Sequence, residues 1–149
     1  MSVSYRQKKK LPDPTGMFIS EILLFGFSGF VGFLVDASIL SLLLDSLGPY
    51  LSRGLSFLAA VFTTWLINRS LTFRARRSEH MPPIEFLVYL GSMMAGGSIN
   101  LGLYALLLEN LPLANAHPTI GVALGSLAGM SVNFILSRTL IFDKKREGS

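Results

Sequence analysis

The sequence contains no cysteine and little charge: 15% of its 149 residues are charged, whereas 50% are hydrophobic. The lack of cysteine excludes disulfide bonds and thiolate metal ligands. The sequence also lacks a P-loop, a cluster of histidines and a nucleophile beside a base, which are patterns typical of common catalytic sites. We therefore expect a protein that is not an enzyme and that uses neither a metal ion nor a cofactor.

Charged residues are almost absent from four windows of the sequence, residues 22–44, 54–73, 86–108 and 120–142. Each window holds about 20 residues or more, enough for a helix to cross ~30 Å of hydrocarbon. The windows lack the polar face that recurs along the helices of a soluble bundle. The connections between them are too short for a soluble domain. The sequence therefore predicts an all-α membrane protein with four transmembrane helices.

Basic residues gather on one side of the predicted membrane. They precede the first window, join the second to the third and follow the fourth: Arg6, Lys8, Lys9, Lys10, Arg74, Arg76, Arg77, Lys144, Lys145 and Arg146. Only Arg53 lies on the other side. The positive-inside rule then predicts a multi-pass protein of the cell (inner) membrane with both termini in the cytoplasm. The basic residues should contact anionic membrane lipids, and without a base-reading element outside the membrane we expect no nucleic acid partner.

The sequence consists of two similar halves. The second and fourth windows align at an offset of 69 residues, which matches Arg69 with Arg138. The first and third windows align at an offset of 64 residues, which matches Asp36 with Asn100. A unit with an even number of spans keeps its orientation when it is repeated. We therefore predict two tandem two-helix hairpins in the same orientation, related by a pseudo-two-fold axis along the membrane normal.

The repeat divides the chain into five segments: a basic cytoplasmic arm, a first helical hairpin, a cytoplasmic linker, a second helical hairpin and a basic cytoplasmic tail. In that order, these five segments are expected at residues 1–16, 17–77, 78–84, 85–142 and 143–149. Small residues at intervals of four, such as Gly121, Gly125 and Gly129, predict close packing of helices inside the membrane.

Two polar residues lie near the predicted membrane midplane. Asp36 and Asn100 each follow the start of their window by 14 residues, which corresponds to a depth of roughly 21 Å. A carboxylate at that depth must be protonated, paired or placed in a water-filled cavity. The pair either holds the two hairpins together or marks a polar point on a path through the membrane.

Two acids and two arginines lie near the cytoplasmic interface. Glu21 and Arg69 belong to the first hairpin, and Glu85 and Arg138 to the second. One interpretation is a structural Glu–Arg pair inside each hairpin. The other is that the arginines bind a lipid phosphate, because a guanidinium holds phosphate through two parallel hydrogen bonds.

Further candidates for a lipid site surround these arginines. Asn68, Thr72 and Ser137 could donate hydrogen bonds to a phosphate or head group. Trp65, Phe73 and Phe142 could line a groove for an acyl or isoprenoid chain, although aromatic residues near an interface are also typical of a simple aromatic belt. The sequence contains no residue spacing typical of a metal site.

The chain resembles the GtrA-like family over about residues 18–142. The resemblance rests on the sequence Asn68-Arg69-Ser70-Leu71-Thr72-Phe73, on its echo Ser137-Arg138-Thr139-Leu140-Ile141-Phe142, and on Gly26-Phe27-Ser28-Gly29 followed by Asp36. It implies a small four-span membrane protein that acts beside polyprenyl-phosphate glycosyltransferases. A similar four-helix domain anchors some dolichol-phosphate mannose synthases. Glu21 and Glu85 stand where the family often has a basic residue, which favours Glu–Arg pairing.

Three hypotheses follow. The first, implied by the resemblance, is that the protein translocates a polyprenyl-phosphate-linked monosaccharide for cell-surface polysaccharide glycosylation. We expect a homodimer in that case, because four helices alone leave little room for a head-group cavity. The second is a non-transporting membrane anchor or adaptor for a glycosyltransferase partner. The third is a small multidrug exporter, which is less favoured because its embedded glutamate in the first helix is missing and the charge bias is strong.

Overall fold

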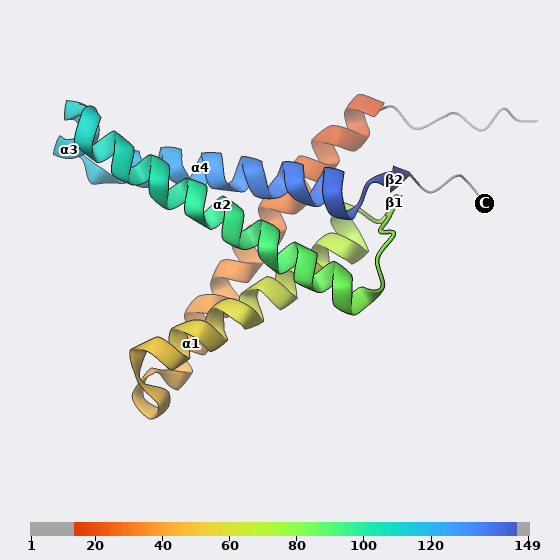
Figure 1. The fold of residues 1–149 in the computed structure, drawn as a ribbon, viewed down its shortest axis with the longest axis horizontal. Coiled ribbons are helices and arrows are strands. Elements are labelled where there is room, and N and C mark those ends of the chain that lie inside the picture. The colour runs from red at the N-terminus through yellow and green to blue at the C-terminus, as the bar shows by residue number, and fades with distance from the viewer. Residues whose placement is uncertain (1–13, 146–149) are drawn as a thin grey trace, which may run out of the picture.

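The computed structural model describes residues 14–145. Residues 1–13 of the expected basic arm and residues 146–149 of the expected basic tail lie outside the described residues. Almost all of the described chain is helical (Figure 1). The elements are α1 (Pro14–Ile67), the π-helix η1 (Asn68–Thr72), β1 (Arg76–Arg77), α2 (Pro82–Asn110), α3 (Pro112–Ala116), α4 (Pro118–Leu136), the π-helix η2 (Ser137–Ile141) and β2 (Lys144–Lys145).

α1 is a hairpin of two legs rather than one straight helix. It turns back at Gly48, whose φ of 72° and ψ of 171° lie in a region that is essentially restricted to glycine. The second hairpin consists of α2 and α4, which lie side by side and are joined by the short α3 (Figure 1). Prolines begin α2, α3 and α4, at the position where a missing N–H costs no helical hydrogen bond.

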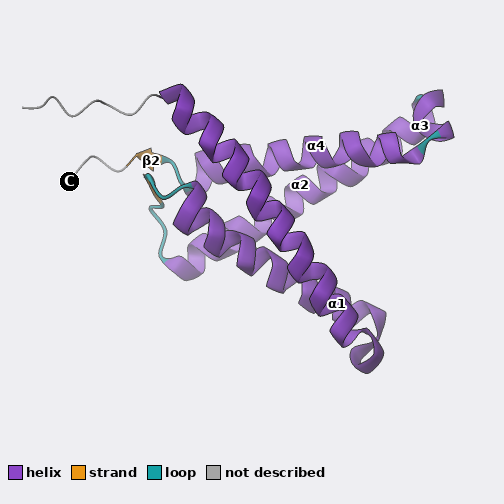
Figure 2. Cartoon of the chain, turned by 180° about the vertical axis from the view of Figure 1, so that it is seen from behind, coloured by secondary structure: helices purple, strands orange, loops and turns teal. Residues whose placement is uncertain are grey.

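The two hairpins meet at one end and diverge towards the other (Figures 1 and 2). The shared end contains η1, η2 and the short antiparallel ladder of β1 and β2, in which Arg76 pairs with Lys145. The turn at Gly48 and the helix α3 lie at the two separate ends. All basic residues of β1 and β2 are therefore brought to the end where the hairpins touch.

The buried aromatic core lies at this shared end. Phe73 and Phe142, which follow η1 and η2, stack with ring centroids 4.8 Å apart. The other members of the core come from both hairpins: Phe25, Val61, Trp65, Tyr89, Phe134 and Ile141. Large apolar side chains elsewhere face outwards, and Leu42, for example, is 77% exposed. Such an exposed apolar surface fits contact with lipid rather than with water.

Glycines let α2 and α4 approach closely, as the small-residue spacing predicted. A Cβ added to Gly129 would lie 2.6 Å from the backbone oxygen of Gly96, and one added to Gly125 would lie 2.7 Å from that of Asn100. In the first hairpin, a Cβ on Gly32 would overlap with the side chain of Thr64. Within lipid, where helices gain nothing from burying apolar surface, such close backbone contact is a main source of association.

The structure confirms the all-helical class and finds three helices in the described residues that are long and apolar enough to cross a membrane. They are Thr15–Gly48, Pro82–Asn110 and Ile120–Ile141. The window predicted at 54–73 is helical, through the second leg of α1 and η1, but it is not among these three. The count of four spans, the pseudo-two-fold axis, the segment boundaries and the cytoplasmic location of both termini stay predictions.

Candidate functional site

The acids and arginines of the predicted interface form ion pairs between the hairpins. Arg138 donates from Nε to Glu21 at 2.7 Å, and Arg69 donates from Nη1 to Glu85 at 3.1 Å. Glu21 therefore binds Arg138 rather than Arg69, and Glu85 binds Arg69 rather than Arg138, so the predicted pairing of these four residues within each hairpin is wrong. The reason is the arrangement at the shared end, where the first leg of α1 packs against α4 and the second leg against α2.

Each acid also has a second partner. Arg76 of β1 donates from Nε to Glu21 at 2.8 Å, and the indole N–H of Trp65 donates to Glu85 at 2.8 Å. Both carboxylates are almost fully buried. A buried carboxylate needs hydrogen bonds and a counter-charge to offset the loss of water, and the two networks supply both. Glu21 thus forms ion pairs with two arginines, whereas Glu85 forms an ion pair with one.

The predicted phosphate donors on η1 and η2 face the interior. Asn68 donates from Nδ2 to the hydroxyl of Tyr89 at 2.7 Å and accepts a hydrogen bond from Thr72 at 2.7 Å. Asn68 and Thr72 are buried, and so is Ser137, whose hydroxyl has no hydrogen-bond partner within the described part of the chain. Asn68 and Thr72 therefore connect the first hairpin to α2 and hold η1 in place.

The aromatic residues predicted to line a lipid groove belong to the core. Trp65, Phe73 and Phe142 are 7%, 0% and 2% exposed. Phe73 and Phe142 stack on each other where the hairpins meet, and Trp65 is fixed by its hydrogen bond to Glu85. Of the three, Phe142 alone borders one of the hollows described below.

A cleft of about 560 Å³ lies between the hairpins. Side chains from both legs of α1 and from α2 and α4 line it, including the predicted midplane residues Asp36 and Asn100. The sequence interpretation did not assign a site role to Asn133, which also faces this cleft. Its Oδ1 atom is buried and has no hydrogen-bond partner among the described residues, and its amide packs against Gly96. A polar residue inside an apolar window is the signal that could have identified it.

A second hollow of about 660 Å³ lies at the shared end and is basic. Arg69, Arg74 and Arg76 line it together with His80, and Glu85 is the acid on its wall. Arg69 lies with its guanidinium 5.5 Å from the ring centroid of Trp65, and its side chain is 39% exposed. From the sequence, Arg74 and Arg76 were predicted only as part of the basic loops, with no place in a site.

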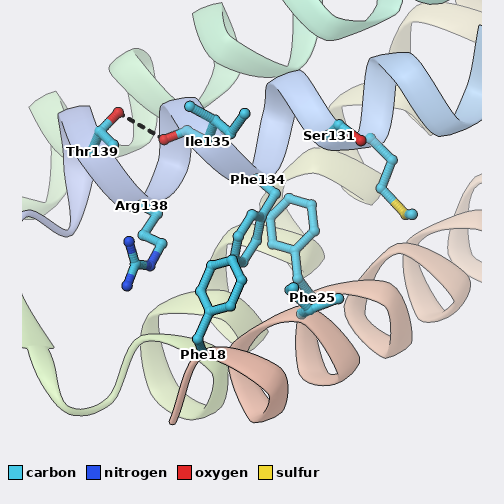
Figure 3. Close-up of a pocket in the computed structure, with 9 residues that line it drawn as sticks. Phe18, Phe25, Ser131, Phe134, Ile135, Arg138 and Thr139 are labelled. Atoms are coloured by element: carbon cyan, nitrogen blue, oxygen red, sulfur yellow. Dashed lines mark hydrogen bonds between the residues drawn. The ribbon is translucent and has the colours of Figure 1, made fainter. Parts of the chain in front are cut away.

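A third hollow, a groove of about 420 Å³, is almost wholly apolar (Figure 3). The first leg of α1 forms one wall, and α4 with η2 forms the other. The lining residues are Phe18, Ile22, Phe25, Met130, Ser131, Phe134, Ile135, Arg138 and Thr139. Arg138 lies with its guanidinium 5.1 Å from the ring centroid of Phe18, and Thr139 donates to the backbone oxygen of Ile135 (Figure 3).

The described chain has long apolar helices with outward-facing leucines. Polar groups face a cleft between them, and basic residues lie at one end. These features define a multi-pass membrane protein. The chain matches the family described as GtrA/DPMS, transmembrane domain, over residues 24–148, and it belongs to that family. The match confirms the resemblance seen in the sequence. No curated protein sequence matches the chain. Membership associates the chain with the translocation or synthesis of lipid-linked sugars.

Proposed function

We propose that the protein moves the head group of a polyprenyl-phosphate-linked monosaccharide across the cytoplasmic membrane through the cleft between its hairpins. The observation that carries this proposal is the polar lining of that cleft. Asp36, Asn100 and Asn133 face a common space inside helices that are otherwise apolar. Polar side chains at membrane depth are costly and are characteristic of transport pathways. Amide and carboxylate groups also form the hydrogen bonds that sugar hydroxyls need.

The basic hollow would receive the phosphate. Arg69 keeps more than a third of its side chain exposed while it binds Glu85, so its remaining N–H groups are available to an anion. Arg74 and Arg76 line the same hollow and add positive field. Phosphate esters favour arginine because its planar guanidinium matches two of their oxygens. Asn68 and Thr72 act in this proposal as positioning residues, because their buried hydrogen bonds hold η1 and thereby aim Arg69 at the hollow.

The family supports this function, because it is associated with lipid-linked sugars. In the proposed topology both termini are cytoplasmic, so the basic hollow faces the leaflet in which the lipid-linked sugar is made. The cleft is open at its side, so a second copy of the chain in a homodimer would shield a crossing head group from lipid. The protein itself performs no chemical step in this proposal.

The test is the rate at which a polyprenyl-phosphate sugar exchanges between the leaflets of liposomes that contain the purified protein. Gly97 lines the cleft, and a Cβ there meets no atom within 4 Å, so Gly97→Leu should fill the cleft without distorting the helix. Gly91→Leu is the matched control, because Gly91 is also on α2 and also unobstructed but lines none of the three hollows.

We expect fast exchange with the wild type and with Gly91→Leu, and exchange at the protein-free rate with Gly97→Leu. Asp36→Asn should slow exchange and leave protein abundance unchanged. Wild-type exchange no faster than in protein-free liposomes would overturn the proposal.

A second function, a membrane anchor for a glycosyltransferase, is favoured by one observation. β1 and β2 pair directly, so that two distant basic segments lie side by side where the hairpins meet. Two adjacent basic segments could dock an acidic partner. Neutralising Arg74 and Arg77 should then abolish co-purification of the glycosyltransferase, with Arg76 kept because it binds Glu21. Under this hypothesis Asp36→Asn should be harmless.

A further inference from the structure

The apolar groove between α1 and α4 ends at a cation (Figure 3). The rings of Phe18 and Phe25 face that of Phe134 with centroids 5.9 Å and 5.4 Å apart. Ser131 lies further along α4 from Arg138 (Figure 3), and it lines the groove beside Met130. Arg138 is 32% exposed and binds Glu21 through Nε. An elongated apolar surface with a guanidinium at one end matches an amphiphile with an anionic head and a long chain.

The charges at that end do not cancel. Glu21 carries one negative charge and receives hydrogen bonds from two arginines, Arg76 and Arg138. One positive charge is therefore left over in the cluster. Because the side chain of Arg76 is only 7% exposed, the excess is accessible mainly through Arg138, at the mouth of the groove. An anionic ligand there would complete the charge balance of a partly desolvated site.

In the other half of the molecule, a phenylalanine stands at the position equivalent to Ser131. Phe62 precedes Ser131 by 69 residues, the same offset that relates Arg69 to Arg138. Phe62 packs against Trp65 and Phe86 with centroids 5.6 Å and 5.7 Å apart. The two halves therefore differ at this position, which carries a small serine beside the groove and a large, half-exposed phenylalanine in the other half.

We propose that this groove binds the chain of a polyprenyl phosphate whose head group has not yet entered the basic hollow, with the phosphate on Arg138 and the isoprenoid chain along the phenylalanine rings towards Ser131. The proposal rests on the proposed function only for the identity of the lipid. The methyl branches and double bonds of an isoprenoid pack well against aromatic faces. The tail then stays at the lipid-facing side of the protein while the head group can reach the hollows at the shared end.

The experiment measures retention of polyprenyl phosphate by the purified full-length protein with native mass spectrometry. Ser131→Phe places in the groove the residue found at the equivalent position 62 of the other half. Ser98→Phe is the matched control, because both serines are exposed on a helix and donate to a backbone oxygen one turn earlier, at 2.7 Å for Ser131 and 3.0 Å for Ser98. We expect Ser131→Phe to lower the affinity by about tenfold or more and Ser98→Phe to leave it unchanged.

Two further arms test the chemistry. Arg138→Gln should weaken binding of polyprenyl phosphate but not of the uncharged polyprenol, while Arg76 still balances Glu21 and maintains the fold. Phosphatidic acid, a two-chain lipid phosphate, should compete poorly. Unchanged binding in Ser131→Phe, or equal competition by phosphatidic acid, would overturn the inference.

These outcomes are separable from those of the proposed function. Gly97→Leu should block leaflet exchange but retain the lipid, because the cleft and the groove are different hollows. If wild-type exchange is fast while Ser131→Phe still binds normally, the groove assignment fails and the function stands. If binding depends on Ser131 but wild-type protein does not exchange lipid, the transport proposal fails and the groove stands.

Discussion

Glu21 is the charged residue whose replacement should destabilise the fold most. Its carboxylate accepts hydrogen bonds from Arg76 at 2.8 Å and Arg138 at 2.7 Å. The side chains of Glu21 and Arg76 are 5% and 7% exposed. Glu21→Gln retains the shape of the side chain but leaves Arg76 as a buried cation without a counter-charge. Because removal of one partner of a buried ion pair costs about 3–5 kcal/mol, we expect a loss of unfolding free energy of that size.

Glu85→Gln provides the comparison. Glu85 is as deeply buried as Glu21, but its partner Arg69 is 39% exposed and can turn towards water. Solvent screening therefore reduces what the pair contributes. The glutamine can still accept the indole N–H of Trp65 through its side-chain oxygen. We expect a smaller loss of about 1–2 kcal/mol, mostly for the weakened hydrogen bonds.

The assay is reversible unfolding in mixed detergent micelles, applied to double-mutant cycles. Glu21 and Arg138 should show a coupling of about 1–3 kcal/mol, whereas Glu21 and Arg69, which make no direct contact, should be additive within about 0.5 kcal/mol. A coupling of Glu21 to Arg69 instead would show that the ion pairs lie within hairpins and would refute the crossed arrangement. Equal losses in Glu21→Gln and Glu85→Gln would refute the reasoning from burial.

Three further predictions concern stability and use the same unfolding assay. Tyr89→Phe leaves the buried amide of Asn68 without its acceptor and should cost about 1–3 kcal/mol; an unchanged transition would mean that this bond does not hold the hairpins. Gly129→Ala places a Cβ 2.6 Å from a backbone oxygen of α2 and should cost about 1–3 kcal/mol, whereas Gly102→Ala, which meets nothing within 4 Å, should be neutral or slightly stabilising. Gly48→Ala forces a side chain into a positive-φ turn and should cost about 1–3 kcal/mol, which a wild-type transition would contradict.

The sequence was sufficient to predict the helical hairpins but not how they pair. Charge-free windows and proline positions identified the helices, and the repeat placed Arg69 and Arg138 at the same level. The partner of Glu21 could not be predicted, because Arg69 and Arg138 are expected at the same depth in the membrane and either could reach it. That choice depends on which helix lies beside which, and the α1–α4 contact of Phe25 with Phe134 decides it. Long-range packing of this kind leaves no periodic signal in a single sequence.

The orientation of individual side chains near the interface was predicted less well for two physical reasons. Inside a membrane both the lipid-facing and the buried faces of a helix are apolar, so Phe73 and Phe142 look alike in the sequence whether they face lipid or each other. In addition, η1 and η2 are π-helical, and their wider turns rotate the side chains that follow relative to an α-helix. Asn68 and Thr72 consequently face the interior, where an α-helical reading allowed them to face a head group.

The way the hairpins are held together bears on the two interpretations of the midplane polar residues. The shared end already joins the hairpins through two crossed ion pairs, the stacked rings of Phe73 and Phe142, and the β1–β2 ladder. Asn133 adds nothing to this joint, because its amide packs on Gly96 within its own hairpin and its Oδ1 atom forms no hydrogen bond to the described residues. A buried amide oxygen without a partner destabilises the fold by about 1–3 kcal/mol. A polar group that is retained at such a cost, in a cleft that is also lined by Asp36 and Asn100, is better explained by contact with a polar ligand than by a structural role.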